Sequence, residues 1–213
     1  MMQLLLILLI SISIHNATIY PIIQNKKPPI RIHYLGHSSF ILFFDNGKSL
    51  LTDYGVSNSY GLNSPIYDLN DFAPDIVIYS HHDQDHDRGQ KFPGAIVLDG
   101  INFSGSGIEI NPFKATERKP DDNYGYEISY KGLKIIFMGD CQGSLKAGDY
   151  KALKGKIKCT PDLLLIPVGW TRDIAGGAAE LTQVLNPVTV IPIHFWTAEE
   201  REKFLDCLGN KFA

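Results

Sequence analysis

The sequence predicts an α/β fold in which two β-sheets pack face to face beneath outer helices. Short apolar runs rich in β-forming residues, separated by turns, make up most of the chain. Helical patterns follow these strand-rich stretches. The chain has 213 residues, of which 44% are hydrophobic, so it is long enough for one substantial core and too short for a second. We therefore expect a single globular domain.

Each element follows from a local pattern. Asp45-Asn46-Gly47-Lys48 predicts a hairpin turn because Asn-Gly readily adopts positive φ. Thr197, with Glu200 three residues later, predicts the capped start of a helix that runs towards Leu208. Further helices are predicted at 149–153 and 177–185. Strands are predicted at 30–34, 39–44, 49–52, 75–79, 94–98, 107–113, 125–130, 133–138, 163–167 and 188–193.

The amino-terminal segment supports two interpretations. Residues 4–14 form an almost unbroken apolar run, which suits a signal-peptide core but is too short to cross a bilayer as a helix of about 20 residues. We therefore expect a signal peptide at 1–17, a linker at 18–29 and the folded domain at 30–213, with export to the periplasm or medium. The alternative is a buried first strand in a cytoplasmic protein, because Ile10, Ile12 and Ile14 alternate with polar residues.

Composition excludes several classes of partner. The net charge is −3, so nothing indicates the basic patch that binds nucleic acid. No segment is long enough for a stable membrane span. The cysteines Cys141, Cys159 and Cys207 are odd in number and irregularly spaced, so they predict no disulfide framework. The expected partner is a small-molecule substrate.

The strongest chemical signal is the segment from Ser80 to Asp87, which holds three histidines and three aspartates in eight positions. Imidazole and carboxylate groups bind divalent metals, and crowded carboxylates are costly unless a cation compensates them. The alternative is a solvated acidic turn, which explains neither the histidines nor the apolar strand leading into them. The segment therefore predicts a metal centre.

This segment resembles the metallo-β-lactamase superfamily, whose signature is H-x-H-x-D-H after a buried strand. The matching residues are His81, Asp83, Asp85 and His86, with Asp83 in place of the usual second histidine. Some relatives, such as the hydrolase domain of DNA-uptake competence proteins, carry the same H-x-D-x-D-H variant. The resemblance implies a four-layer αβ/βα sandwich. The extra carboxylate favours manganese or iron relative to zinc.

A second resemblance covers the start of the predicted domain. Gly36-His37-Ser38-Ser39-Phe40, followed by a strand ending in Asp53, is similar to the ascorbate-phosphate-lactonase-like branch of the superfamily. The resemblance implies that His37 borders the site and that the Asp53 side chain supports the metal-binding segment from Ser80 to Asp87. Without the resemblance, His37 and Asp53 are each equally compatible with a hydrogen-bonded structural role.

Three further ligands are implied by position relative to the signature. Asp140 ends an apolar strand in Gly-Asp, where the family has its bridging aspartate, and His194 ends another strand in Pro-Ile-His. The family also expects a histidine between the signature and the bridging aspartate, but no histidine lies between His86 and His194. Glu117 occupies roughly that place, and the alternative for it is a surface glutamate paired with Arg118 or Lys119.

The resemblance therefore implies a metal-dependent hydrolase with two divalent ions, zinc or manganese, with iron as a further option. His81, Asp83 and Glu117 would hold one ion and Asp85, His86 and His194 the other, with Asp140 shared. A metal-bound hydroxide would cleave a phosphoester, a lactone or a related ester or amide. The catalytic residues would be Asp85 and the proton donor His37, whereas His82 would act as a spacer.

Two other functions remain open at this stage. A carboxylate-rich His/Asp site also suits an iron-dependent oxidoreductase, and loss of two expected histidines suits a degenerate metal-binding protein without activity. The substrate would be anionic if four side chains line the mouth of the site, although all four are equally compatible with a surface position. These are Lys114, Arg118, Trp170 and Arg172.

Overall fold

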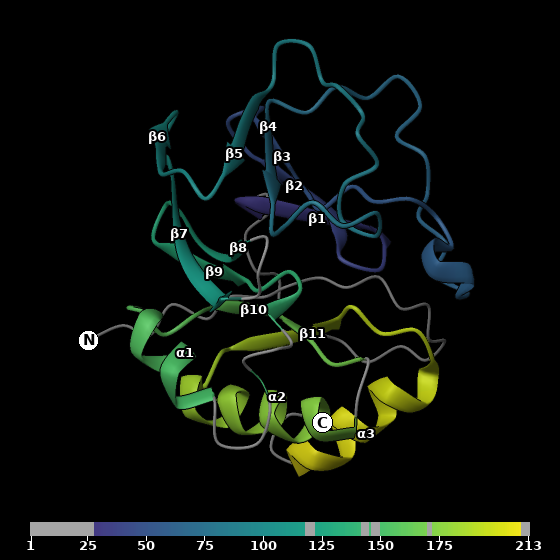
Figure 1. The fold of residues 1–213 in the computed structure, drawn as a ribbon. Helices are drawn as coiled ribbons and strands as arrows, with labels where there is room; N and C mark the ends of the chain where they lie inside the picture. Colours follow the sequence, from purple (N-terminus) through teal and green to yellow (C-terminus); the bar gives the residue numbers. More distant parts are fainter. Residues whose placement is uncertain (1–27, 118–121, 142–144, 146–149, 170–171, 210–213) are drawn as a thin grey trace, which may run out of the picture.

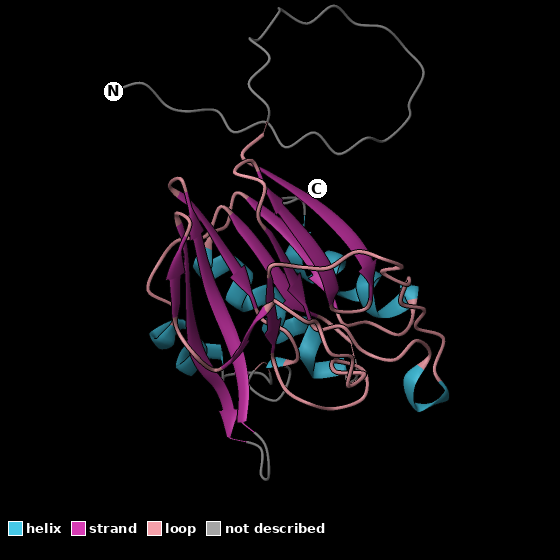
Figure 2. Cartoon of the chain, turned by 90° about the horizontal axis from the view of Figure 1, so that it is seen from above, coloured by secondary structure: helices cyan, strands magenta, loops and turns pink. Residues whose placement is uncertain are grey.

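Two β-sheets form the centre of the computed structural model (Figure 1), which describes residues 28–117, 122–141, 145, 150–169 and 172–209. The first sheet has the strand order β1-β2-β3-β4-β5 and the second has the order β11-β10-β9-β8-β7-β6. Figure 2 shows that the strands of both sheets run in broadly the same direction, as expected for sheets packed face to face. The predicted α/β fold of two packed sheets is confirmed.

The first sheet combines antiparallel and parallel pairing. Its antiparallel strands are β1 (Ile30–Gly36), β2 (Ser39–Phe44) and β3 (Ser49–Thr52), and the predicted turn joins β2 to β3, with Gly47 at a φ of 84°. β4 (Ile76–Tyr79) and β5 (Ile96–Asp99) then pair in parallel. β4 is buried along its whole length, which explains its continuous apolar sequence.

The second sheet begins with an antiparallel meander and ends with two parallel strands at its other edge. Two strands are longer than predicted, and the short β6 was not predicted. The strands are β6 (Phe103–Gly105), β7 (Ile108–Glu117), β8 (Asp122–Tyr130), β9 (Leu133–Phe137), β10 (Leu163–Pro167) and β11 (Thr189–Ile193).

Figure 1 shows the helices α1 (Tyr150–Lys156), α2 (Arg172–Leu185) and α3 (Ala198–Leu208) on the outer side of the second sheet. The predicted capping box at the start of α3 is confirmed. α2 starts before the predicted residue 177, because Gly177 lies inside the helix. A Cβ atom there would come within 1.6 Å of the Leu145 carbonyl oxygen, so this glycine permits close packing.

Three apolar clusters hold these layers together. Side chains of both sheets, including Phe40, Tyr126 and Phe137, fill the space between the sheets, and a second cluster lies under the helices. The third cluster covers the outer face of the first sheet and includes Tyr54 and Ile66 from the chain between β3 and β4. In the described part of the molecule, that face is covered by loop and by the short η1 (Ser59–Gly61).

The predictions for the amino terminus lie largely outside the described residues. The signal peptide at 1–17 falls among residues 1–27, and the linker at 18–29 reaches only residues 28 and 29 of the described chain. The single domain at 30–213 remains a prediction. None of the described helices has the length and apolar character needed to span a membrane.

Candidate metal centre

The candidate site lies where several strands end. Parallel neighbouring strands in a sheet end at the same edge, and such edges are common ligand sites in α/β proteins. His37 lies in the turn between β1 and β2. The other residues follow strand ends: Asp53 after β3, His81, Asp83, Asp85 and His86 after β4, Asp140 after β9 and His194 after β11. We call His37, His81, Asp83, Asp85, His86, Asp140 and His194 the His/Asp cluster.

Three site residues adopt left-handed backbone conformations that non-glycine residues rarely occupy. The φ angles are 52° for His37, 30° for Asp53 and 51° for His194. Such conformations cost about 1–3 kcal/mol each and persist where surrounding contacts impose them. The His194 amide donates to the His37 carbonyl (3.3 Å), and the His194 carbonyl accepts from the Gly169 amide (3.0 Å). The backbone is therefore held so that both imidazoles turn into the cluster.

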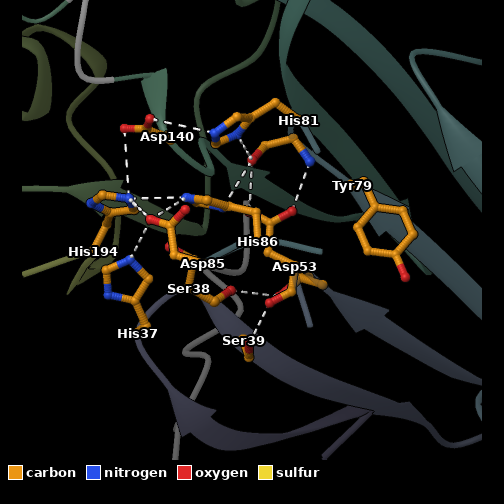
Figure 3. Close-up of polar contacts among 12 residues, drawn as sticks. His37, Ser38, Ser39, Asp53, Tyr79, His81, Asp85, His86, Asp140 and His194 are labelled. Carbon is orange, nitrogen blue, oxygen red and sulfur yellow. Dashed lines mark hydrogen bonds and ion pairs between the residues drawn. The ribbon is translucent and has the colours of Figure 1, made fainter. Parts of the chain in front are cut away.

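Three imidazoles surround one carboxylate oxygen in the centre of the cluster (Figure 3). Oδ2 of Asp85 lies 3.3 Å from Nε2 of His86 and 3.3 Å from Nε2 of His194. Nε2 of His37 lies 3.4 Å from the same oxygen. The Nε2 atoms of His86 and His194 are only 2.9 Å apart. These four residues are all buried, and their ligand atoms lie within 4.8 Å of one another.

Asp53 orients His86 through the ring nitrogen that faces away from the cluster. Its Oδ2 accepts from Nδ1 of His86 (2.7 Å) and from Oγ of Ser80 (2.7 Å), and its Oδ1 accepts from the Ser80 amide (2.7 Å). With Nδ1 directed to a carboxylate, Nε2 of His86 faces the cluster. Gly139 makes this arrangement possible, because a Cβ atom there would lie 2.1 Å from the Ser80 Cβ.

Asp140 lies between two histidines at the other side of the cluster. Its Oδ2 is 3.8 Å from Nε2 of His81, and its Oδ1 is 3.7 Å from Nε2 of His194. His81 also lies 3.3 Å from the exposed carboxylate of Asp83. His81 belongs to two further sets of residues, and within each set the ligand atoms lie within 4.8 Å of one another. They are His81, His86 and Asp140, and His81, Asp83 and Asp85.

The electrostatics of the cluster suit a cation. Burial alone would lower the pKa of His86, but Asp53 and Asp85 outweigh it and raise that pKa well above its usual value. The pKa of His194 is lowered well below its usual value, first by burial and then by His37. Burial and His86 lower the pKa of His81 to about 4. The carboxylates thus favour positive charge beside neutral imidazoles, which is the combination that binds a divalent metal.

The structure brings together seven of the eight residues predicted for the site. The eighth, Glu117, ends β7 opposite Asp122 in the β7–β8 register, and its side chain lies outside the described residues. His82 contacts Asp87 and Asp99 (2.9 Å each) and belongs to none of the three ligand sets. The side chains of Arg118, Trp170 and Arg172, predicted for the mouth, also lie outside the described residues, whereas Lys114 is half-buried on β7.

Sequence reasoning missed two aromatic residues beside the cluster. The Trp196 ring packs against His37, with ring centroids 4.4 Å apart. The Tyr60 hydroxyl lies 3.5 Å from Oδ1 of Asp85. Trp196 follows the predicted ligand His194 by two positions, which is a usable signal. Tyr60 lies in the long connection between β3 and β4 and carries no signal of its own.

Comparison with known proteins agrees with this geometry. The family described as "Beta-lactamase superfamily domain" matches residues 31–194. A "UPF0173 metal-dependent hydrolase" of Methanobrevibacter smithii is 25% identical over 204 residues, covering 79% of this chain and 82% of the relative. A protein of the same description from Pyrococcus abyssi is 24% identical and covers 85% of this chain and 93% of the relative.

Solved structures confirm the fold. The metallo-beta-lactamase fold protein YhfI of Bacillus subtilis superposes with a TM-score of 0.63 at 12% identity, covering 86% of this chain and 93% of that chain. The ascorbate-phosphate-lactonase-like branch and its motif are not distinguished by these comparisons and remain predictions. The superfamily itself is confirmed, because the matched segment includes most of the chain and every ligand candidate from His37 to His194. The chain belongs to the beta-lactamase superfamily.

Proposed function

We propose that this protein is a hydrolase that binds two divalent metal ions at the His/Asp cluster and cleaves a phosphoester, a lactone or a related ester or amide. The observation that carries the proposal is the convergence of imidazole and carboxylate groups from three separate strand ends and one turn on a space a few ångströms across. The names of both sequence relatives, which describe metal-dependent hydrolases, support the same class.

The ligand sets suggest how two ions would be shared. His86 and His194, with Asp85, would hold one ion, and His81 with Asp83 would hold the other, completed by Glu117. Asp140 lies between His81 and His194 and would bridge the two. When bound, such ions lower the pKa of water towards neutrality and stabilise the negative charge that develops at the attacked centre.

The chain itself contributes positioning. Asp53 fixes the His86 ring so that Nε2 faces the cluster, and the Gly169 and His37 backbone contacts fix His194. The Trp196 ring packs against His37, which is buried, and this contact helps to keep water from that imidazole. These groups hold the ligand atoms before a metal or substrate arrives, which reduces the cost of ordering them.

His37 suits metal binding better than proton donation. It is 3% exposed, and its Nε2 belongs to the same ligand set as Asp85, His86 and His194. Burial lowers the pKa of His37, so the imidazole is neutral near pH 7 and carries no extra proton to transfer. We therefore propose His37 as a ligand or ligand-contacting residue in place of the proton donor expected from the sequence.

The metal is proposed to be zinc or manganese. Three imidazoles and one carboxylate resemble the nitrogen-rich sites that hold zinc, whereas the set of His81, Asp83 and Asp85 offers more oxygen and suits manganese. The substrate is proposed to be a small molecule, and an anionic one if Arg118 and Arg172 line the entrance.

The test is reconstitution followed by a substrate panel. Protein stripped of metal with a chelator is loaded with zinc, manganese or ferrous iron, and the bound metal is measured by mass spectrometry. Chromogenic phosphodiesters, lactones and esters are then offered to each form. We expect about two ions per chain and hydrolysis that depends on the metal. Oxygen consumption by the iron form without hydrolysis would favour an oxidoreductase, and metal binding without any turnover would favour a binding protein.

A further inference from the structure

We propose that the Tyr60 hydroxyl is a catalytic hydrogen-bond donor at the mouth of the His/Asp cluster, where it binds a substrate oxygen that gains negative charge. The acceptor would be a carbonyl or phosphoryl oxygen beside the bond to be cleaved. The proposal rests on the proposed hydrolase function for its catalytic part. Its binding part, recognition of an oxyanion next to the metal ions, is measurable without turnover.

The Tyr60 hydroxyl is close to a buried carboxylate of the His/Asp cluster. It lies 3.5 Å from Oδ1 of Asp85, whereas Oδ2 of the same carboxylate faces the imidazoles of His37, His86 and His194. The hydroxyl therefore approaches Asp85 at the carboxylate oxygen that faces away from these three ion-pair contacts. A distance of 3.5 Å is at the long limit for a hydrogen bond, so an incoming oxygen competes with Asp85 for this proton at little cost.

Tyr60 lies at the surface, whereas the residue that its hydroxyl contacts is buried. Asp85 is 4% exposed, but Tyr60 is 49% exposed, and Gln84, which also hydrogen-bonds the Tyr60 hydroxyl, is exposed as well. One end of the Tyr60 side chain thus reaches a buried ligand candidate while the residue itself borders solvent. A substrate oxygen bound beside Asp85 would therefore lie within reach of this hydroxyl.

The backbone around Tyr60 adopts a strained conformation. Tyr60 has a φ of 55° and Asn58 a φ of 56°, and a glycine would occupy such a conformation more easily than a tyrosine. Surrounding hydrogen bonds impose the conformation, because Asn58 and Ser64 bond each other twice and the Val56 amide donates to the Gln84 carbonyl (2.7 Å). The contact between Val56 and Gln84 joins the segment that carries Tyr60 to the segment from Ser80 to Asp87.

Trp196 provides a rigid neighbour for the Tyr60 ring. Their ring centroids are 6.4 Å apart with an interplanar angle of 78°, the edge-to-face arrangement that aromatic rings prefer. Trp196 in turn packs against His37. The two aromatic rings and the imidazole therefore form a continuous wall, which aims the hydroxyl at one place. A pre-aimed donor beside developing charge is the arrangement that stabilises oxyanions in hydrolases.

The experiment compares Tyr60→Phe with Tyr67→Phe. Phenylalanine retains the ring and its contact with Trp196 and removes only the hydroxyl. Tyr67 is the matched control, because it lies in the same connection and is 70% exposed. For each metal-loaded protein, metal content is measured by mass spectrometry, affinity for inorganic phosphate by calorimetry, and kcat and KM with the best substrate of the panel.

We expect Tyr60→Phe to bind phosphate about tenfold more weakly and to lower kcat about 10²-fold, as loss of one oxyanion donor typically does. Its metal content should equal that of the wild type, and Tyr67→Phe should match the wild type in every measurement. Loss of metal in Tyr60→Phe would show instead that the hydroxyl only orients Asp85, and the proposal would be overturned.

Two further outcomes separate this proposal from the proposed function. If the metal-loaded wild type binds phosphate but hydrolyses nothing, weaker binding by Tyr60→Phe would still support the oxyanion contact while the hydrolase function fails. If the wild type hydrolyses a substrate and Tyr60→Phe does so equally well, with equal phosphate affinity, the Tyr60 proposal is wrong and the hydrolase function stands. A metal-loaded wild type that binds no phosphate also overturns the proposal.

Discussion

The Nε2 atoms of His86 and His194 lie 2.9 Å apart, although the two residues are 108 positions apart in the sequence. They belong to different sheets, because His86 follows β4 and His194 follows β11. Imidazole nitrogens at this distance share either a proton or a cation. Burial, followed by His37, lowers the pKa of His194, which disfavours a second proton on this pair.

Replacement of His194 with alanine should abolish metal binding at the set shared with Asp85 and His86. The matched control is His33→Ala, because His33 is an exposed histidine on β1 outside the cluster. We expect the affinity of the His194 variant to fall by more than the about 10–100-fold typical for loss of an outer contact, and no change in the control. Calorimetric titration with zinc and manganese measures both, and equal affinities in the two variants would contradict the assigned ligand set.

Asp53→Asn should weaken metal binding although Asp53 belongs to none of the three ligand sets. The amide places a donor against Nδ1 of His86, which turns or reprotonates the ring, and an about 10–100-fold loss of affinity follows. Asp75→Asn is the control, because Asp75 holds the amide and hydroxyl of Ser49 much as Asp53 holds those of Ser80. Asp75→Asn should lower stability and leave metal affinity unchanged.

Asp140→Ala should abolish activity while the fold remains intact. Asp140 is partly exposed, and its carbonyl, which survives the substitution, accepts from the Asn123 side chain. Loss of the carboxylate removes the group between His81 and His194, so we expect kcat/KM to fall by at least about 10²-fold. Thermal unfolding monitored by circular dichroism checks the fold. A variant that retains full activity would argue against a shared pair of ions.

Metal addition should stabilise the protein. An ion that binds the folded chain at 100 times its Kd adds about 2.7 kcal/mol to the free energy of unfolding. For a domain of this size, that corresponds to a rise in Tm of about 5–10 °C. Scanning calorimetry of chelated protein with zinc, manganese or magnesium ranks the metals. A Tm that none of them raises would count against a metal centre.

Asp75 should contribute stability that depends on pH. The Lys48 ammonium, more than the Ser49 contacts, lowers the pKa of Asp75 below its usual 3.8. This contribution is therefore complete above about pH 5 and is lost as the pH falls through the folded pKa. The free energies of unfolding of wild type and Asp75→Asn in urea should differ by about 1 kcal/mol at pH 6, and the difference should be smaller at pH 3. A difference that is the same at both pH values would refute this.

The sequence alone predicted most strands because their signals are local. Alternation, turn residues and the Thr197–Glu200 capping box each depend on a few neighbouring positions. The same applies to the dense segment after β4, whose composition indicates a metal without knowledge of any other part of the chain. Helix α2 was predicted too short, because Gly177 marks a close contact with Leu145 that no local pattern reveals.

The sequence by itself determined which chemical groups are available: imidazoles and carboxylates in H-x-D-x-D-H, and the residues Asp140 and His194 at strand ends. Only the tertiary structure decided which of them meet. The strand order within each sheet and the packing of the two sheets bring the residues after β4 and β11 together. They also place Asp53 against Nδ1 of His86, include His37 in a ligand set and set Tyr60 beside Asp85. Strand order depends on contacts between distant segments, and local residue patterns do not record those contacts.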